Sequence, residues 1–464
     1  MYRSSWSPRP LLVLGTAWSL ACGPSTPEVV PVQADACILT QGSSAGDTIT
    51  VALGEPVNPA HAPAPSSSAE RLLFRHLYQT LIRVDCHGEA MPGLAESWAP
   101  HEDNRVWSFT LRRDAAFWDG SPVTAESIRE SWLKDVPHRS APWADGVSSS
   151  VSITGERELT VTLRRPYQEV PLVFADPTLA VARAVDASNG WALGTGTYQV
   201  AKHTENEIHV APLGAASSDD LPVLRFFDFG DDPRDAIDLG ADLLITREPI
   251  VVDYIGTIAD LEALPQPWDL VYVLVVPLRM TGEVGAEQGV TLAQTLGSGS
   301  VRTESRPPEA PLWWANFDAC RLMSSFSVPP DPGDIAGRIV YRRSDPDGRA
   351  LAERLVALAA SGGLPQISGT PERLTAAGLG DERFAQSLAE GRDLGLVLAM
   401  PIQVLDPCAM IAPMHRGMPW VATADLHRVL VPLLETRSRI IVRQGVGTMV
   451  DWDGMPFLSV TVGR

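Results

Sequence analysis

The stretch FWDGSPVTAESIRESW, residues 117–132, combines a turn with an amphipathic helix and decides the fold of this chain. Its Asp-Gly pair at 119–120 is a turn signal, and Thr124 stands where a helix N-cap is expected. Ile128 and Trp132 are four residues apart, which places them on one side of the helix. None of these residues suggests catalysis, so the stretch predicts a structural element of a folded domain.

The segments around this stretch alternate apolar and polar residues, as half-buried strands do. RVWSFTLRR (105–113) alternates throughout, and SVSITGERELTVTLRR (150–165) has the pattern of a hairpin. Upstream, residues 69–81 carry apolar side chains at helical spacing. Residues 70–170 are therefore predicted to form a helix and a β-meander with a small core of their own. The predicted core residues are Trp107, Phe109, Leu111, Phe117 and Trp132.

The second half of the chain has a different pattern, in which buried strands alternate with helices. WDLVYVLVVP (268–277) and DLGLVLAM (393–400) are continuous apolar runs, short enough for strands that are buried on both faces. Between them, DGRALAERLVALAAS (347–361) has leucines at helical spacing. This alternation predicts an α/β lobe whose sheet is covered on both faces.

Length and charge restrict the class of protein. A chain of 464 residues predicts two or three domains. The formal net charge is −19, from 56 acidic and 37 basic residues. This balance argues against nucleic acid as a partner, because a surface that binds nucleic acid must be basic.

The N-terminus has the order of a secretory signal, with basic, then apolar, then small residues. We predict a signal peptide over residues 1–21, whose apolar part is shorter than the about 20 residues that span a bilayer. Ala21 before Cys22 resembles a bacterial lipoprotein cleavage site, so Cys22 is the predicted lipidation site, and plain secretion is the alternative. Residues 22–39, rich in Pro, Ser and Val, predict a flexible tether. The expected location is the periplasm or cell envelope.

Four cysteines follow Cys22, namely Cys37, Cys86, Cys320 and Cys408. An even number in an exported protein predicts two disulfides. We predict the pairs Cys37–Cys86 and Cys320–Cys408, because each pair then lies within one half of the chain. Buried free thiols are the alternative.

Enzyme signatures are scarce in this sequence. It contains no Gly-x-Ser-x-Gly motif, no phosphate-binding loop that ends in Gly-Lys-Ser/Thr and no His-Glu-x-x-His. LGTGTY (193–198) has two glycines spaced as in a dinucleotide-binding loop, but the third glycine is missing. The sequence therefore predicts no enzymatic activity, no cofactor and no metal.

The succession LLFRHLYQTLIRVDCHGEAMPGLAESW (72–98), followed by FWDGSPVTAESIRESW, resembles the signature region of the family 5 extracellular solute-binding proteins. These proteins are receptors for dipeptides, oligopeptides and, in some members, nickel chelates, and they serve ABC importers. The resemblance is dense over residues 49–135. GTGTYQV (194–200) and Asp406-Pro407 are similar to two later points of the family pattern, whereas residues 280–340 match little of it.

The resemblance implies an α/β fold, a two-lobed periplasmic-binding-protein clamshell (type II-like) with an extra small α+β domain. Lobe I would comprise residues 40–57, 190–268 and 436–464, the extra domain residues 58–189, and lobe II residues 269–435. The ligand would lie between the lobes. Its contacts with both lobes would shift the population toward a closed state that a membrane permease reads.

The resemblance also implies a ligand site, which in a peptide binder needs an acid for the amino terminus and aromatic walls. The expected ligand-binding residues are Glu55, Asn58, Trp313, Trp314 and Asp406. Asp406 is the position nearest to the aspartate that commonly pairs with the α-amino group of the peptide in such binders. Structural roles are the alternatives: a turn for Glu55, packing within the lobe for the two tryptophans, and a loop cap for Asp406.

The predicted function is that of a monomeric substrate-binding protein of an ABC transporter. It would capture a peptide or similar small solute and deliver it to a permease in the membrane. The alternative is a non-transport envelope lipoprotein, a sensor or interaction protein on the same scaffold with a diverged cleft. The unmatched residues 280–340 motivate this alternative.

Overall fold

The computed structural model describes residues 37–40, 48–101, 103–133, 148–184, 190–214, 221–230, 232–277, 292–309, 312–315, 336–361, 374–421 and 425–458. The predicted signal peptide (1–21), Cys22, Cys320 and most of the predicted tether lie outside these residues. Within them, no helix combines the length and the apolar character that crossing a membrane requires.

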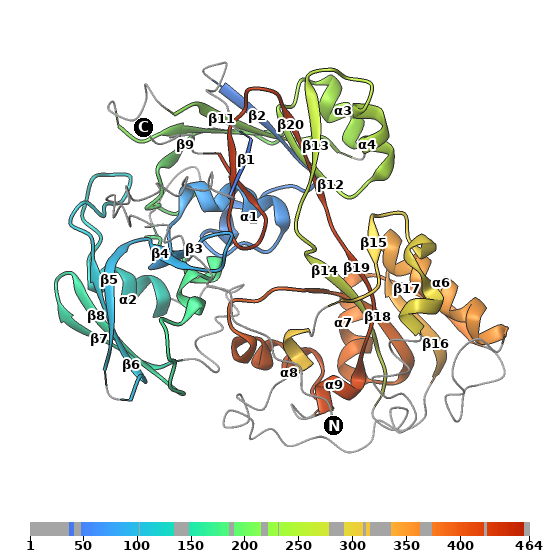
Figure 1. The fold of residues 1–464 in the computed structure, drawn as a ribbon. Helices are drawn as coiled ribbons and strands as arrows, with labels where there is room; N and C mark the ends of the chain where they lie inside the picture. Colours follow the sequence, from blue (N-terminus) through green and yellow to red (C-terminus); the bar gives the residue numbers. More distant parts are fainter. Residues whose placement is uncertain are drawn as a thin grey trace, which may run out of the picture. The chain divides into compact units, whose positions relative to one another are not determined.

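The first large element is a seven-stranded mixed sheet with the strand order β13-β20-β12-β2-β11-β10-β9 (Figure 1). Its central strand β2 is parallel to β11 and β12 and is buried on both faces. Ile49 and Val51 of β2 belong to the core that contains helix α1, whereas Ala52 belongs to the core that contains α3 and α4. The elements are β2 (Thr48–Leu53), α1 (Ser68–Leu77), β9 (Tyr198–His203), β10 (Glu207–Pro212), β11 (Val223–Asp228), α3 (Pro233–Asp238), β12 (Leu243–Thr246), α4 (Pro249–Ile255), β13 (Leu261–Pro265) and β20 (Arg439–Arg443).

The second large element is a six-stranded sheet with the order β15-β19-β14-β18-β16-β17 (Figure 1). Strand β14 alternates between two cores, because Val271 and Val273 pack with α7, α8 and α9, whereas Tyr272 and Leu274 pack with α6. Both faces are covered, as the continuous apolar runs predict. The elements are β14 (Leu270–Val275), β15 (Ser305–Arg306), β16 (Ala336–Arg342), α6 (Pro346–Ala360), β17 (Thr375–Leu379), α7 (Asp381–Glu390), β18 (Asp393–Pro401), α8 (Ile411–Gly417), α9 (Leu426–Val429) and β19 (Leu430–Thr436).

Two crossings connect these sheets in the described part of the chain. The first crossing runs from β13 to β14 (265–270), and the second runs from β19 to β20 (436–439). They lie side by side, because Gln266 N–H donates to Ser438 O at 3.0 Å and Asp269 N–H donates to Thr436 O at 3.3 Å. The predicted boundaries between lobe I and lobe II, 268/269 and 435/436, are at these crossings in sequence, and the division into lobes at them stays a prediction.

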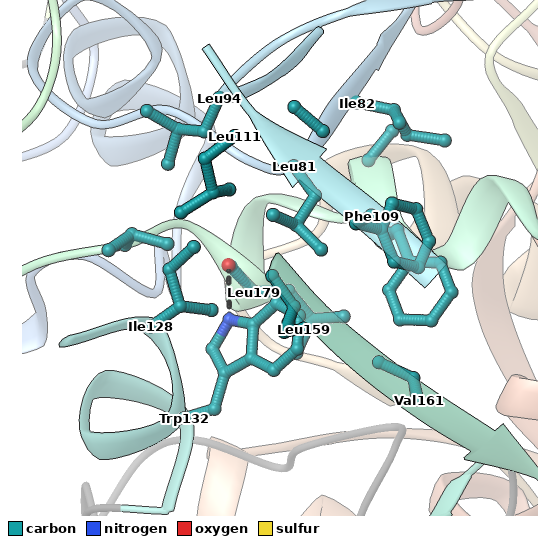
Figure 2. Close-up of a cluster of buried hydrophobic side chains, with 14 of the residues drawn as sticks. Leu81, Ile82, Leu94, Phe109, Leu111, Ile128, Trp132, Leu159, Val161 and Leu179 are labelled. Atoms are coloured by element: carbon teal, nitrogen blue, oxygen red, sulfur yellow. Dashed lines mark hydrogen bonds between the residues drawn. The ribbon is translucent and has the colours of Figure 1, made fainter. Parts of the chain in front are cut away.

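A four-stranded antiparallel sheet, in the order β5-β6-β8-β7, packs on helix α2 and forms a separate core. Thr124 caps α2 by accepting a hydrogen bond from Ser127 N–H at 3.2 Å. Figure 2 shows this core, in which Trp132 Nε1 donates to Leu179 O at 2.8 Å. The predicted core residues of the stretch, Phe117 and Trp132, are both buried here. The strands and helix are β5 (Ala95–His101), β6 (Val106–Leu111), α2 (Ala125–Leu133), β7 (Ser148–Gly155) and β8 (Glu158–Leu163). We call this core, with its residues between 81 and 181, the four-stranded unit.

Helix α1 belongs to a different core from the one its sequence position suggests. It lies within residues 58–189, which we expected to form the extra domain, but Leu73 and Leu77 pack in the core of the seven-stranded sheet. Buried His76 joins α1 to Leu458, the last described residue, since Nδ1 donates to Leu72 O at 2.9 Å and Nε2 accepts from Leu458 N–H at 3.1 Å. Burial, together with the charge of Arg75, lowers the pKa of His76 to about 3, so the ring stays neutral.

Smaller elements complete the described structure. β1 (Ile38–Thr40), β21 (Thr448–Val450) and β22 (Pro456–Phe457) form one small sheet, and β3 (Ile82–Val84) pairs with β4 (Ala90–Pro92). The Cys37–Cys86 disulfide is present, which confirms that predicted pair. Cys408 is also disulfide-bonded, and its pairing with Cys320 stays a prediction because Cys320 lies outside the described residues. Short 3-10 helices are η1 (Pro59–His61), η3 (Leu172–Ala175), η4 (Pro177–Leu179), η6 (Ser298–Ser300), η7 (Trp313–Ala315) and η9 (Pro407–Met410).

Candidate ligand-binding site

A cavity of about 710 Å³ lies where the two large sheets meet, beside both crossings. Its walls come from the ends of β2, β12 and β18, the N-terminus of α1, both crossings and the residues before β22. Its polar and aromatic lining residues include Glu55, Ser66, Arg71, Arg247, Trp268 and Asp269. Both sheets therefore contribute to the walls of one cavity.

The wall from α1 is fixed by Glu70, a buried carboxylate in the first turn of the helix. It accepts hydrogen bonds from the backbone N–H of Asn58 (3.0 Å) and of Ser66 (2.7 Å). It also accepts from Ser66 Oγ (2.9 Å) and from His61 Nδ1 (2.7 Å). Burial by itself would raise the pKa of Glu70, but these bonds lower it below its ordinary value. Ionised Glu70 therefore holds Ser66 in the cavity wall.

Replacing Glu70 with glutamine should lower the free energy of unfolding by about 2 kcal/mol at pH 7, because an amide nitrogen cannot accept the N–H groups that the carboxylate holds. The wild-type contribution is present above the ordinary glutamate pKa of about 4.3 and is lost as pH falls through the lower pKa of the folded protein. Urea unfolding of both proteins at pH 7 and at about pH 3 measures the effect. The difference should shrink at the lower pH, and an equal difference at both values would contradict this role.

Arg247, which follows β12, joins the two crossings at the cavity. Its guanidinium donates to Asp269 Oδ2 in the first crossing and to Thr436 Oγ1, at 3.2 Å, where the second crossing begins. Ser438 Oγ lies 3.5 Å from the same Asp269 oxygen. Burial raises the pKa of Asp269, and the charge of Arg247 opposes that shift. One guanidinium thus connects the seven-stranded sheet to both crossings.

Trp268, in the first crossing, lines the cavity between two arginines. The Cζ atoms of Arg306 and Arg437 lie 4.4 Å and 4.6 Å from its ring centroid. Each arginine is held by an acid, Arg306 by Glu435 and Arg437 by Glu304. These cation–π contacts fix the indole.

The cavity also presents charged side chains that the described residues leave unpaired or only weakly paired. Among the described residues, the carboxylates of Glu55 and Glu248 have no hydrogen-bond or ion-pair partner. The Arg71 guanidinium is 44 % exposed and reaches only to 4.0 Å from Asp453. Groups of both signs at one cavity suit a ligand that carries both an ammonium and a carboxylate.

The structure distributes the predicted ligand-binding residues over several places. Glu55 lines the cavity, whereas the exposed Asn58 caps η1 with its side chain. Trp313 Nε1 donates to Pro401 O at 2.9 Å, beside the cavity rather than in its wall. Trp314 is only 3 % exposed and packs in the core of the six-stranded sheet. Both tryptophans thus occupy the packing role that was the alternative.

Asp406 lies away from this cavity, and its carboxylate already has partners. Arg165 Nη2 donates to Oδ1 at 2.8 Å, and the Tyr167 hydroxyl donates to Oδ2. The backbone N–H of Cys408 also donates to Oδ1, at 2.8 Å. The side chain is 2 % exposed. Asp406 is therefore an internal ion-pair partner in this conformation and caps the turn that follows it.

Ser66, His61 and Glu70 combine the residue types of a hydrolase triad without its geometry. Ser66 Oγ and Glu70 Oε1 both bond to the same ring nitrogen, His61 Nδ1, at 2.8 Å and 2.7 Å. In a catalytic triad the serine and the acid bond to opposite ring nitrogens. The cluster therefore fixes the loop and does not activate the serine.

Among the cavity residues that the sequence did not indicate, Arg247, Trp268, Asp269 and Ser438 form the group at the crossings. They come together because two crossings far apart in sequence lie side by side. The available signal was PQPWDL (265–270), a proline-containing break between two apolar strands.

Sequence comparison finds similar proteins for one segment of this chain. Residues 89–211 match the family described as bacterial extracellular solute-binding proteins, family 5 Middle. The periplasmic oligopeptide-binding protein OppA of Escherichia coli is 42 % identical over 76 residues, 16 % of this chain and 14 % of that protein. The nickel-binding periplasmic protein of E. coli is 31 % identical over 115 residues, 24 % of this chain and 21 % of that protein. The matches thus span about a fifth or less of these relatives.

Solved structures match nearly the whole chain. NikA from Brucella suis in complex with Fe(III)-EDTA has a TM-score of 0.64 at 16 % identity, over 89 % of this chain and 99 % of that one. A dipeptide-binding protein from Pseudoalteromonas in complex with Met-Leu has a TM-score of 0.63 at 13 % identity, over the same shares. These likenesses establish the two-lobed α/β clamshell fold.

Proposed function

We propose that this chain, a family 5 extracellular solute-binding protein by its middle segment and its fold, binds a small solute between its lobes and releases it unaltered to an ABC permease. The observation that carries the proposal is the cavity, whose walls come from both large sheets and both crossings. A ligand that contacts both sheets favours the state in which they are close, by the difference of its affinity for the two states.

The proposed solute is a short peptide or a similar zwitterion. A cavity of about 710 Å³ is in the usual range of small-molecule sites, about 300–1,000 Å³. Glu55 and Glu248 offer carboxylates to an ammonium group, and Arg71 offers a guanidinium to a carboxylate. The names of the relatives, which include oligopeptide-binding and dipeptide-binding proteins, favour the same class.

We place the mature protein in the periplasm as a monomer, with a lipid anchor at Cys22. The order of residues at the N-terminus and the relatives named as periplasmic support this location. Radiolabelled palmitate incorporation that disappears in a Cys22→Ser variant would establish the anchor. If the wild-type protein incorporates no palmitate, the protein is secreted without a lipid anchor.

The test of binding begins with mass spectrometry of small molecules released when protein purified from its native host is denatured. The released solute is then titrated into ligand-free protein by calorimetry. Glu55→Gln and Arg71→Met should each weaken binding about 10- to 150-fold, the scale of one charge-assisted hydrogen bond.

Glu353→Gln, an exposed ion-pair partner of Arg349 on α6, serves as the matched control and should bind normally. If no solute is released and dipeptides give no heat, solute capture is refuted, and the envelope sensor or interaction protein takes its place.

A further inference from the structure

The segment 401–409 extends from the cavity to the four-stranded unit, and we call it the strap. It begins at the end of β18 with Pro401 and Gln403 in the cavity wall. Farther along, Leu405 packs on the core of the four-stranded unit, and Ala409 is 5 % exposed within that core. The strap thus belongs to the chain of the six-stranded sheet but ends in the core of another unit.

Asp406 adds a charged contact to this apolar one. Arg165 and Tyr167, which follow β8 in the four-stranded unit, both donate to its carboxylate. The Arg165 guanidinium also lies over the Tyr167 ring, 4.0 Å from the centroid. Burial, and then the charge of Asp406, raise the pKa of Tyr167, so its hydroxyl keeps the proton that it donates. The three side chains form one hydrogen-bonded group across the two units.

We propose that this group is a latch, which holds the strap against the four-stranded unit, closes the cavity without ligand, and opens to admit the solute. The proposal rests on the proposed function. In the described part of the chain, two crossings join the two large sheets. Rotation of one sheet relative to the other about these crossings therefore separates the parts of the two sheets' surroundings that lie away from the crossings. The strap contact is not covalent and carries cavity-lining residues at its other end, so it is the contact that such movement breaks.

The latch also determines which carboxylate can bind the ammonium group of a solute. Because Arg165 and Tyr167 occupy both oxygens of Asp406, an incoming ammonium finds no free carboxylate there. Glu55 and Glu248, whose carboxylates have no partner among the described residues, are on the cavity side near the crossings. A buried ion pair contributes little net stability but strongly favours one arrangement, since removing one partner leaves a buried charge unpaired. Such a pair suits a contact that must switch between two states.

The test compares ligand-free wild type with Asp406→Asn and Arg165→Met by small-angle X-ray scattering. Each variant should remain folded and have a larger radius of gyration than the wild type, because the open state gains population. Tyr167→Phe, which removes one hydroxyl, should give a smaller increase in the radius of gyration. It replaces the other two variants in the test if they unfold. Asp393→Asn is the control, since Asp393 is equally buried and paired with Arg338 within the six-stranded sheet. It should leave the radius unchanged.

Calorimetry with the released solute gives the second arm. If the closed state falls to about 1–10 % of molecules, the apparent Kd of Asp406→Asn rises about 10- to 100-fold. An unchanged radius in folded Asp406 and Arg165 variants overturns the latch, and weaker binding at an unchanged radius makes Asp406 a ligand contact instead. The scattering arm uses no ligand, so a failure of the latch is distinguishable from a failure of the proposed function.

Discussion

Replacing Gly196 with alanine should lower the free energy of unfolding by about 4 kcal/mol. A Cβ at this position would lie 2.2 Å from His76 O and 2.6 Å from Leu77 C, at the end of α1. Both atoms belong to backbone, so no side-chain rotation relieves the overlap. Overpacking in cores typically costs about 1–3 kcal/mol, and an overlap with fixed backbone exceeds that range. The close approach also allows a hydrogen bond, in which Gly196 N–H donates to Leu77 O at 2.9 Å.

Urea unfolding of the variant measures this effect, and Gly299→Ala is the matched control. A Cβ on Gly299 meets no atom within 4 Å, so that variant should stay within about 0.5 kcal/mol of the wild type. Gly194→Ala tests the same contact from the other side, where a Cβ would lie 2.2 Å from Leu77 O and 2.3 Å from Trp118 Cζ2. Wild-type stability of both variants would show that the segment before β9 does not approach α1 so closely.

These glycines show what spacing alone can and cannot predict. In LGTGTY the Gly-x-Gly spacing resembles a fragment of a dinucleotide-binding loop, and the sequence could only reject that function for want of a third glycine. The structure gives the physical reason for both residues, because the chain passes directly over the carbonyl end of α1 before β9 begins. That reason involves two segments more than a hundred residues apart, so no local pattern contains it.

The fold could be predicted wherever apolar residues recur in the sequence at the regular spacing of a strand or a helix. Trp107, Phe109 and Leu111 alternate in the sequence and are all buried on one face of β6. Helix α1 was predicted correctly as a helix but was given to the wrong core. An apolar stripe shows that a helix face is buried and does not say against which sheet. The assignment was decided by contacts with β2 and β9, which the sequence does not encode locally.

The site was less predictable, because it consists of a few polar groups from separate segments. Glu55 was predicted from its place in the loop after the first strand and lines the cavity, and its contact with a ligand stays a prediction. The adjacent Trp313 and Trp314 suggested an aromatic wall, yet large aromatic side chains more often stabilise cores, as Trp314 does here. The partners of Asp406 lie 241 and 239 residues away, so its charge alone could not reveal whether ligand or protein neutralises it.

Replacing Arg247 with methionine should destabilise the protein by about 3 kcal/mol at pH 7. The substitution leaves the Asp269 carboxylate without its cation, and the other oxygen of that carboxylate, Oδ1, is already buried without a hydrogen-bond partner. Removing one member of a buried pair costs about 3–5 kcal/mol, and partial exposure of both side chains places this pair at the lower end. The substitution also removes the bond from Arg247 to Thr436, so β12 loses its side-chain link to the second crossing.

The dependence on pH and a second substitution identify the cause. The folded pKa of Asp269 is raised by burial and rises further without Arg247, so the variant is more stable at low pH and loses that stability as pH rises through the folded pKa. The difference in the free energy of unfolding between variant and wild type, measured by urea unfolding, should therefore narrow between pH 7 and about pH 4.

Asp269→Asn in the Arg247→Met background should recover most of the lost stability, since no charge is then left unpaired. Arg349→Met, which breaks an exposed pair with Glu353, should cost at most about 0.5 kcal/mol. Failure of Asp269→Asn to recover stability would mean that Arg247 acts through its bond to Thr436 and not through the charge of Asp269.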